Sequence, residues 1–356
     1  DPRALVRVRV EYDTGEVEAP TDVRPTVVIA GGGLMVKLPV VASPSGEVTV
    51  TVYAPGVVEA STVTGTTKLV PDGPDATTPA VTVYSEAGGY SGYSYIRLRG
   101  IDQTRLNITV DGVPLNDPED QVLYFSNVPD FLGSMQSVEV GRGAGGSTFG
   151  TASFAGSLNF QSVPLAATPR GSQLELSGGS FGTWRSSVQG ATGLSSGGFA
   201  SYGRVTRQGT SGYRDHSGND SWSAFGSTGW FGASDALKLT AFAGNSGTRL
   251  AYLAASEAEL KANPRVNPLT DQEGDRFHQE MVSAQYAHAF SDRLTATAMA
   301  YRNSAAGAYD VSFGAAPGGG LSIANYGLAH VWYGTTAALT WSARDLSLAA
   351  GVTATD

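Results

Sequence analysis

The stretch YIRLRGIDQTRLNITVDGVPLND, residues 95–117, reads as two strands followed by a tight turn. Apolar and polar residues alternate twice within it, with the two-residue period of a strand that buries one face. The pair Asp111-Gly112 then fits a type I′ turn, in which both central residues have a positive φ. We therefore predict a β-hairpin that turns at these two residues.

A second stretch, SVEVGRGAGGSTFGTASFAGSLNF, residues 137–160, reads as two more strands joined by a Gly-rich segment. Between the two stretches, the residues near Phe131 fit a helical turn. We expect an α+β domain over residues 86–164.

Beyond residue 170 the sequence repeats segments of about ten residues with the same two-residue period. Leu237 and Leu239, for example, alternate with Lys238 and Thr240. A transmembrane strand has this pattern because its side chains face lipid and lumen in turn. We predict the first strands, about nine, of a truncated antiparallel transmembrane β-barrel over 170–356.

The connections between these segments alternate in length. Short polar ones are followed by long ones, which we expect at about 207–221, 246–278 and 304–328. Periplasmic turns and extracellular loops alternate in the same way. Aromatic residues at segment ends, such as Trp222 and Trp230, suit the girdles at the two membrane interfaces. By pattern alone, a secreted β-sandwich or β-solenoid stays open as an alternative.

The N-terminal part of the chain has a different sequence pattern. Residues 1–60 contain short alternating segments broken by turns, which indicates a small β-sandwich. Residues 61–85 are rich in Thr, Pro, Gly and Asp and are typical of a linker. The whole chain is therefore expected to be mainly β.

Composition excludes several classes of function. Charged residues make up 15% of the chain, and Cys is absent. A disulfide framework and a thiolate metal site are thereby ruled out. The formal net charge is -9 and no basic run stands out, so nucleic acid is not an expected partner. The sequence contains no run of 18 apolar residues, so no transmembrane helix is predicted.

The middle of the chain resembles a known family. The matching elements, in order, are Leu98-Arg99-Gly100, Asp111-Gly112-Val113-Pro114, Val138-Glu139-Val140, Arg142-Gly143, Gly150, Ala152, Gly156 and Asn159. Their order and spacing are similar to those of the plug domain of TonB-dependent outer-membrane receptors.

The resemblance implies a plug enclosed by the barrel in a bacterial outer membrane, with the N-terminal module in the periplasm. It implies TonB-dependent active transport of a scarce solute, first of all a ferric siderophore, otherwise cobalamin or an oligosaccharide. The partners would be TonB with its inner-membrane energising complex, outer-membrane lipid and the small-molecule ligand. A surface receptor or adhesin without transport is the alternative. No enzymatic activity and no cofactor are expected.

The resemblance also assigns roles to particular residues. Plug arginines would pair with acidic residues and dock the plug, and a TonB-contacting segment would precede it. The apical loops would meet the ligand through aromatic side chains. The residues are Arg99, Arg142, Glu139 and Glu175 for docking; Val57, Val58 and Val63 for TonB contact; and Tyr90, Tyr93, Tyr95 and Tyr124 for the ligand.

Other motifs have simpler explanations. Gly141, Gly143 and Gly146 match a dinucleotide fingerprint, but a strand is expected after them where that motif requires a helix. The run Asp117-Pro118-Glu119-Asp120 lacks the ligand spacing of a calcium loop. The four histidines are scattered along the chain. No catalytic or metal-ligating residue is therefore predicted.

Overall fold

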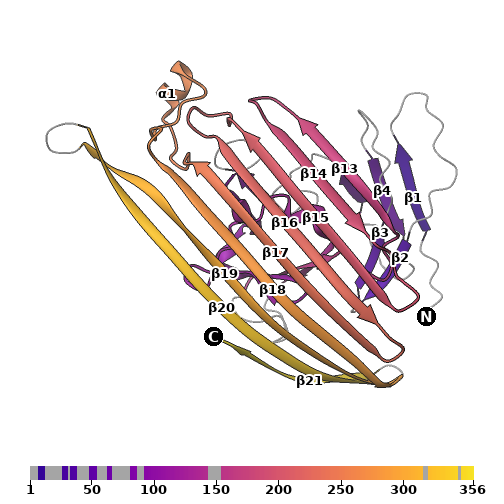
Figure 1. Ribbon diagram of the computed structural model, residues 1–356. Helices are drawn as coiled ribbons and strands as arrows, with labels where there is room; N and C mark the ends of the chain where they lie inside the picture. Colours follow the sequence, from indigo (N-terminus) through magenta and orange to yellow (C-terminus); the bar gives the residue numbers. More distant parts are fainter. Residues whose placement is uncertain are drawn as a thin grey trace. The chain divides into compact units, whose positions relative to one another are not determined.

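The computed structural model describes residues 7–12, 26–30, 33–37, 48–53, 62–65, 81–85, 92–142, 154–315, 320–343 and 346–356 (Figure 1). The chain divides into two compact units. One comprises residues 1–69 and 75–79, and the other comprises residues 70–74 and 80–356. Strands are the main secondary structure of both, as the sequence predicts.

The N-terminal unit contains two small antiparallel sheets. One has the order β1 (Arg7–Tyr12), β4 (Val48–Tyr53) and β5 (Thr62–Gly65), and the other pairs β2 (Thr26–Ala30) with β3 (Gly33–Lys37). Strand β5 lies in the stretch that we expected to be a linker. Val63 belongs to β5, whereas Val57 and Val58 lie outside the described residues.

The plug region of the second unit contains two further sheets. Strand β7 (Ser94–Leu98) pairs with β6 (Val81–Ser85) and with β8 (Ile101–Asp102). The other sheet has the order β10 (Val113–Pro114), β9 (Leu106–Val110), β12 (Gly156–Ser162) and β11 (Met135–Arg142). Strand β12 runs parallel to β9, and the other pairs are antiparallel.

The helical part of the plug region consists of three short 3-10 turns. These are η1 (Gln103–Arg105), η2 (Phe125–Asn127) and η3 (Phe131–Ser134). The turn predicted at Asp111-Gly112 is confirmed, with φ values of 50° and 85°. The strands next to this turn contribute to the core of the plug region, and β9 is buried along its whole length. The core includes Ile96, Leu98, Leu106, Ile108, Val110, Phe125, Leu158 and Phe160.

A nine-stranded antiparallel sheet follows, in which each strand pairs with the next along the chain (Figure 1). The sheet has the number of strands, about nine, that the sequence predicts for this part of the chain. We call this sheet the wall. Its strands are β13 (Gly171–Gly178), β14 (Trp184–Ala191), β15 (Phe199–Thr210), β16 (Asn219–Phe231), β17 (Asp235–Arg249), β18 (Gly274–Ser291), β19 (Leu294–Ala315), β20 (Leu321–Ala343) and β21 (Leu346–Thr355).

The strands of the wall are longer than the sequence predicts. The expected loops at about 207–221, 246–278 and 304–328 are partly strand, because β19 has 22 residues and β20 has 23. The run Ala305-Ala306-Gly307-Ala308 in β19 interrupts the apolar–polar alternation, but the backbone ladder continues. The connection between β17 and β18 stays long and holds α1 (Glu257–Ala262).

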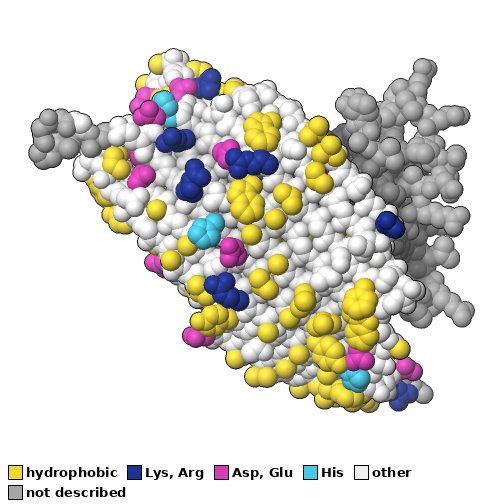
Figure 2. Space-filling view, viewed as in Figure 1, with side chains coloured by type: hydrophobic (Ala, Val, Ile, Leu, Met, Phe, Trp, Pro, Cys, Tyr) yellow, Lys and Arg dark blue, Asp and Glu magenta, His cyan; other side chains and the backbone are white. Residues whose placement is uncertain are grey.

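The outer face of the wall carries aromatic residues at two levels. Trp222 and Trp230 on β16 are exposed and eight residues apart, and so are Tyr333 and Trp341 on β20. The residues between each pair that share this face are small or apolar. Apolar side chains gather over the lower part of this face and most charged ones lie above them (Figure 2). None of the helices in the described part of the chain combines the length and the apolar character needed to cross a membrane.

Candidate functional site

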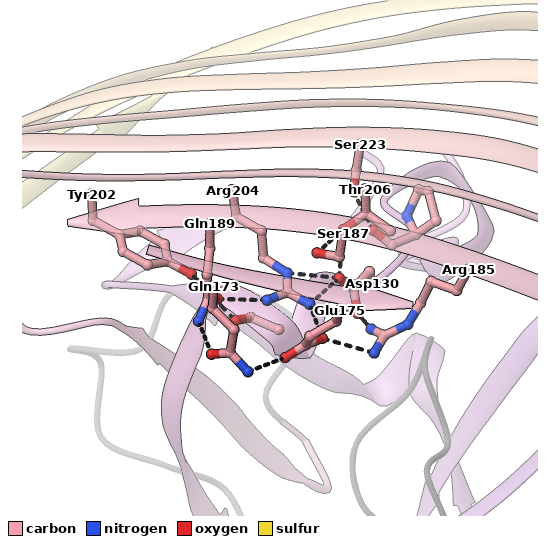
Figure 3. Close-up of polar contacts among 12 residues, drawn as sticks. Asp130, Gln173, Glu175, Arg185, Ser187, Gln189, Tyr202, Arg204, Thr206 and Ser223 are labelled. Carbon is pink, nitrogen blue, oxygen red and sulfur yellow. Dashed lines mark hydrogen bonds and ion pairs between the residues drawn. The ribbon is translucent and has the colours of Figure 1, made fainter. Parts of the chain in front are cut away.

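The inner face of the wall meets the plug region at a cluster of charged side chains around Asp130 (Figure 3). Arg185 on β14 binds the Asp130 carboxylate, and Nε of Arg204 on β15 donates to it at 2.7 Å. Oγ1 of Thr206 donates to the same carboxylate at 2.6 Å. Glu175 on β13 accepts from Arg185 at 2.9 Å and from Arg204 at 3.0 Å. Two carboxylates and two guanidinium groups therefore form one network without net charge.

This network is largely withdrawn from water. The side chain of Asp130 is 3% exposed and that of Arg204 is 5% exposed. Charged groups this deeply buried are stable only when they are paired and hydrogen-bonded. We infer that the network fixes the position of η2 and η3 against the wall, because neither side can separate without exposing an unpaired charge.

Local backbone geometry brings Asp130 into the network. Asp130 has φ 57°, in the left-handed region, immediately before η3. Aspartate is among the non-glycine residues that adopt this region most readily. Within η3, Gly133 lies directly beneath the guanidinium group of Arg204, and a Cβ there would lie 2.6 Å from Nε. The absence of a side chain at this position lets the turn approach the wall.

The docking residues predicted from the sequence are only partly in this network. Glu175 belongs to it. Arg99 and Glu139 lie exposed and outside it, and the side chain of Arg142 lies outside the described residues. Docking roles for these three stay predictions. In the network the wall supplies the arginines and the plug supplies the acid Asp130, whereas the sequence suggested plug arginines with acidic partners.

A second set of contacts holds the hairpin at Asp111 to the wall. Nζ of Lys238 on β17 donates to Oδ2 of Asp111 and to Oγ of Ser162, both at 2.8 Å. Nε2 of Gln285 on β18 donates to the Asp111 carbonyl oxygen at 2.6 Å. The type I′ turn therefore presents both its side chain and its backbone to the wall.

A cavity of about 480 Å³ lies between the plug region and the end of the wall near the long β17–β18 connection. Tyr93, Tyr95 and Tyr124 line it from the plug side. The sequence analysis assigned these three tyrosines to one ligand-binding site. Tyr90 lies outside the described residues. The wall contributes residues that the sequence did not single out: Asp275, Phe277, Tyr309, Leu328 and His330. Tyr252 joins them from the β17–β18 connection. Binding of a ligand here stays a prediction.

Polar contacts across this cavity join the plug region to the wall. The Tyr93 hydroxyl donates to Oδ2 of Asp275 at 2.5 Å. Nδ1 of His330 lies 2.8 Å from Oδ2 of Asp117, and its Nε2 lies 3.0 Å from Oε2 of Glu119. In the described ranges, no group of three or more His, Asp or Glu side chains is arranged to hold a metal ion.

Replacing Tyr93 by phenylalanine should loosen this end of the plug region. Burial, reinforced by the charge of Asp275, raises the pKa of the Tyr93 phenol well above its usual value, so the hydroxyl remains a donor at neutral pH. A hydrogen bond to a charged acceptor contributes about 1.5–3 kcal/mol. We expect faster hydrogen exchange at residues 92–98 in the variant.

Tyr309→Phe is the matched control, because the Tyr309 hydroxyl lines the same cavity without a hydrogen bond within the described residues. Equal exchange in the two variants would contradict the role of the Tyr93 hydroxyl. In the native protein this contribution is complete below pH of about 10, the unfolded pKa of tyrosine, and declines as the pH rises toward the higher folded value.

Comparison with known proteins matches one part of the chain to a family model. The family model of the TonB-dependent receptor plug domain matches residues 49–157. This chain carries a TonB-dependent receptor plug. The match begins within β4 of the N-terminal unit and ends within β12 of the plug sheet. Most of the motif elements that carry the sequence resemblance lie inside it.

Solved structures of an import receptor and of two transporters share the fold of the plug and wall. The ferric-catecholate import receptor Fiu from E. coli K12, in its open form, is 18% identical with a TM-score of 0.58, over 73% of this chain and 43% of that one. The copper transporter OprC is 21% identical with a TM-score of 0.62, over 78% and 41%. The unliganded ferric citrate transporter FecA is 14% identical with a TM-score of 0.62, over 78% and 43%.

The chain thus spans less than half the length of the structures that it resembles. A sequence search finds no match among curated proteins. At these identities the structures establish the common fold of plug and antiparallel wall.

Proposed function

We propose that this chain belongs to an outer-membrane receptor that imports a scarce solute with energy supplied through TonB. The observation that carries the proposal is the neutral, buried network that joins Asp130 of the plug to Arg185 and Arg204 of the wall. A plug held in this way blocks the lumen, and opening a path requires work to separate paired charges. The inner-membrane complex would supply that work through TonB.

The outer face of the wall supports a membrane location. Eight residues of strand span about 26 Å along the strand at about 3.3 Å per residue. With a tilt of 35–45°, the interval between the aromatic levels corresponds to a height of about 20 Å, close to the apolar band of about 25 Å in outer-membrane barrels. We propose that these aromatic residues mark the two interfaces of the bacterial outer membrane, with the N-terminal unit in the periplasm.

The direct test compares uptake in cells with and without TonB. Cells that produce the full-length receptor receive labelled ferric siderophores, cobalamin and oligosaccharides. TonB-dependent accumulation of one class supports transport and names the solute. Binding that never leads to accumulation would favour a surface receptor or adhesin, the alternative that the fold also permits.

A proline scan tests the proposed TonB contact at Val57, Val58 and Val63. Such contacts form when a strand of the partner pairs edge to edge with the receptor, and proline removes a backbone donor from that pairing. We expect Val58→Pro to abolish TonB-dependent uptake while ligand binding at the cell surface is retained. Val58→Thr keeps the backbone donor and should transport normally. Full uptake by the proline variant would place the contact elsewhere.

A further inference from the structure

The cavity between plug and wall is negatively charged. Asp117, Glu119 and Asp120 approach it from the plug loop and Asp275 from β18. No Lys or Arg is among its described lining residues, and His330 is the one residue there that can carry a positive charge. Four carboxylates face one imidazole, so the lining stays negative in either protonation state of the histidine.

Aromatic rings surround these carboxylates. Tyr93 and Tyr95 are stacked with centroids 6.4 Å apart, and Tyr124 meets Tyr93 edge to face at 5.8 Å. Tyr252 of the β17–β18 connection and Tyr309 on β19 add two more rings. The face of an aromatic ring attracts a cation that lies within about 6 Å of its centre. The rings and the carboxylates therefore both favour a positively charged ligand.

A buried polar side chain also opens into the cavity. Asn127 is 4% exposed and belongs to the lining. Its Oδ1 accepts from Oγ of Ser126 at 3.4 Å. The lining therefore includes a neutral polar side chain beside its negative and aromatic groups.

We propose that the ligand captured in this cavity presents an ammonium or guanidinium group to the tyrosine rings and carboxylates. The assignment rests on the proposed function, since it names the chemistry of the solute that the receptor would import. A bare metal ion does not fit, because the described acidic and histidine side chains form no group of three that could coordinate it. An anionic chelate would meet repulsion from all four carboxylates.

Charged thiol reagents test the cavity without knowledge of the natural ligand. This chain contains no Cys, so Tyr95→Cys places a single thiol in its cavity, and Ala262→Cys places one on the exposed helix α1. Any cysteine elsewhere in the full-length receptor is replaced by serine. The measured quantity is the rate of labelling by a trimethylammonium methanethiosulfonate relative to that by its sulfonate counterpart.

We expect this rate ratio to be about tenfold higher at Tyr95→Cys than at Ala262→Cys in about 0.1 M salt. Adding Asp117→Asn and Glu119→Gln should lower it to about threefold, because half of the carboxylates are neutralised. A ratio at Tyr95→Cys that is equal to or below the control value would overturn the proposal.

A matched pair of small ligands tests binding itself. N-acetyl-arginine methyl ester carries a guanidinium group, and N-acetyl-citrulline methyl ester is its neutral counterpart. The arginine ester should slow labelling of Tyr95→Cys by a neutral reagent, and the citrulline ester should not. Equal effects of the two esters, including no effect of either, would count against a cationic ligand.

These outcomes are separable from those of the transport test. Labelling and protection do not require TonB, so a receptor that proves not to transport can still show the predicted charge preference. TonB-dependent uptake of an anionic ferric chelate, with no preference for the cationic reagent, would support transport and refute the cationic ligand.

Discussion

Asp130→Asn in the full-length receptor is expected to release the plug from the wall. The change leaves Arg185 and Arg204 with Glu175 as their remaining carboxylate, and one positive charge becomes unpaired in a buried setting. Removing one partner of a buried ion pair costs about 3–5 kcal/mol. Cells that produce the variant should become permeable to large antibiotics, and proteases should cleave the plug faster.

The matched control is Asp220→Asn on the outer face of the wall. Asp220 pairs with Arg207 at 2.5 Å, but the two side chains are 58% and 49% exposed. Exposed pairs contribute about 0–1 kcal/mol, so this variant should keep native permeability and protease resistance. If both variants behave like the native receptor, the Asp130 network does not fix the plug.

Gly244→Ala is expected to force the plug away from β17. Gly244 lies on the inner face of the wall, where an added Cβ would overlap the carbonyl oxygen of Asn127 and lie 3.0 Å from Cα of Val128. Backbone atoms cannot rotate out of the way, so the two elements must separate. Overpacking of this kind costs about 1–3 kcal/mol, occasionally more. Thermal unfolding and hydrogen exchange of η2 would measure the loss.

Gly226→Ala on the neighbouring β16 separates this clash from the general effect of glycine in a strand. A Cβ at Gly226 meets nothing within 4 Å. The change should be neutral or stabilising by about 0.5–1 kcal/mol, because alanine loses less backbone freedom on folding. The two alanine variants are therefore expected to shift stability in opposite directions, and a shift in the same direction would refute the close contact.

Local features of the fold were predictable from the sequence, because neighbouring residues encode them. The type I′ turn follows from Asp111-Gly112, and the number of wall strands follows from a repeated two-residue period. The lengths of the strands were not predictable, because a run of Ala and Gly at 305–308 interrupts the alternation within β19. Backbone pairing continues through this run, and it leaves little trace in the side-chain pattern.

The candidate sites were predictable only in part, for a different reason. Tyr93 immediately precedes β7 and Tyr95 lies within it, two residues further along, so their shared side could be predicted from the sequence. Asp275 meets Tyr93 across 182 residues. Similarly, Glu175 was singled out, but its network depends on Asp130 of a distant turn. Charge alone does not reveal which of many acids and bases the tertiary fold brings together.

The equal interval between Trp222 and Trp230 and between Tyr333 and Trp341 has a consequence for the lipid in the proposed membrane location. Two strands separated by three others have outer faces of the same apolar height, so a bilayer around this part of the wall would have a uniform thickness. Removing one residue within such an interval would turn every following side chain to the opposite face. Removing two would keep the faces but shorten the apolar span by about 6.6 Å along the strand, and the lipid would have to thin locally to match it.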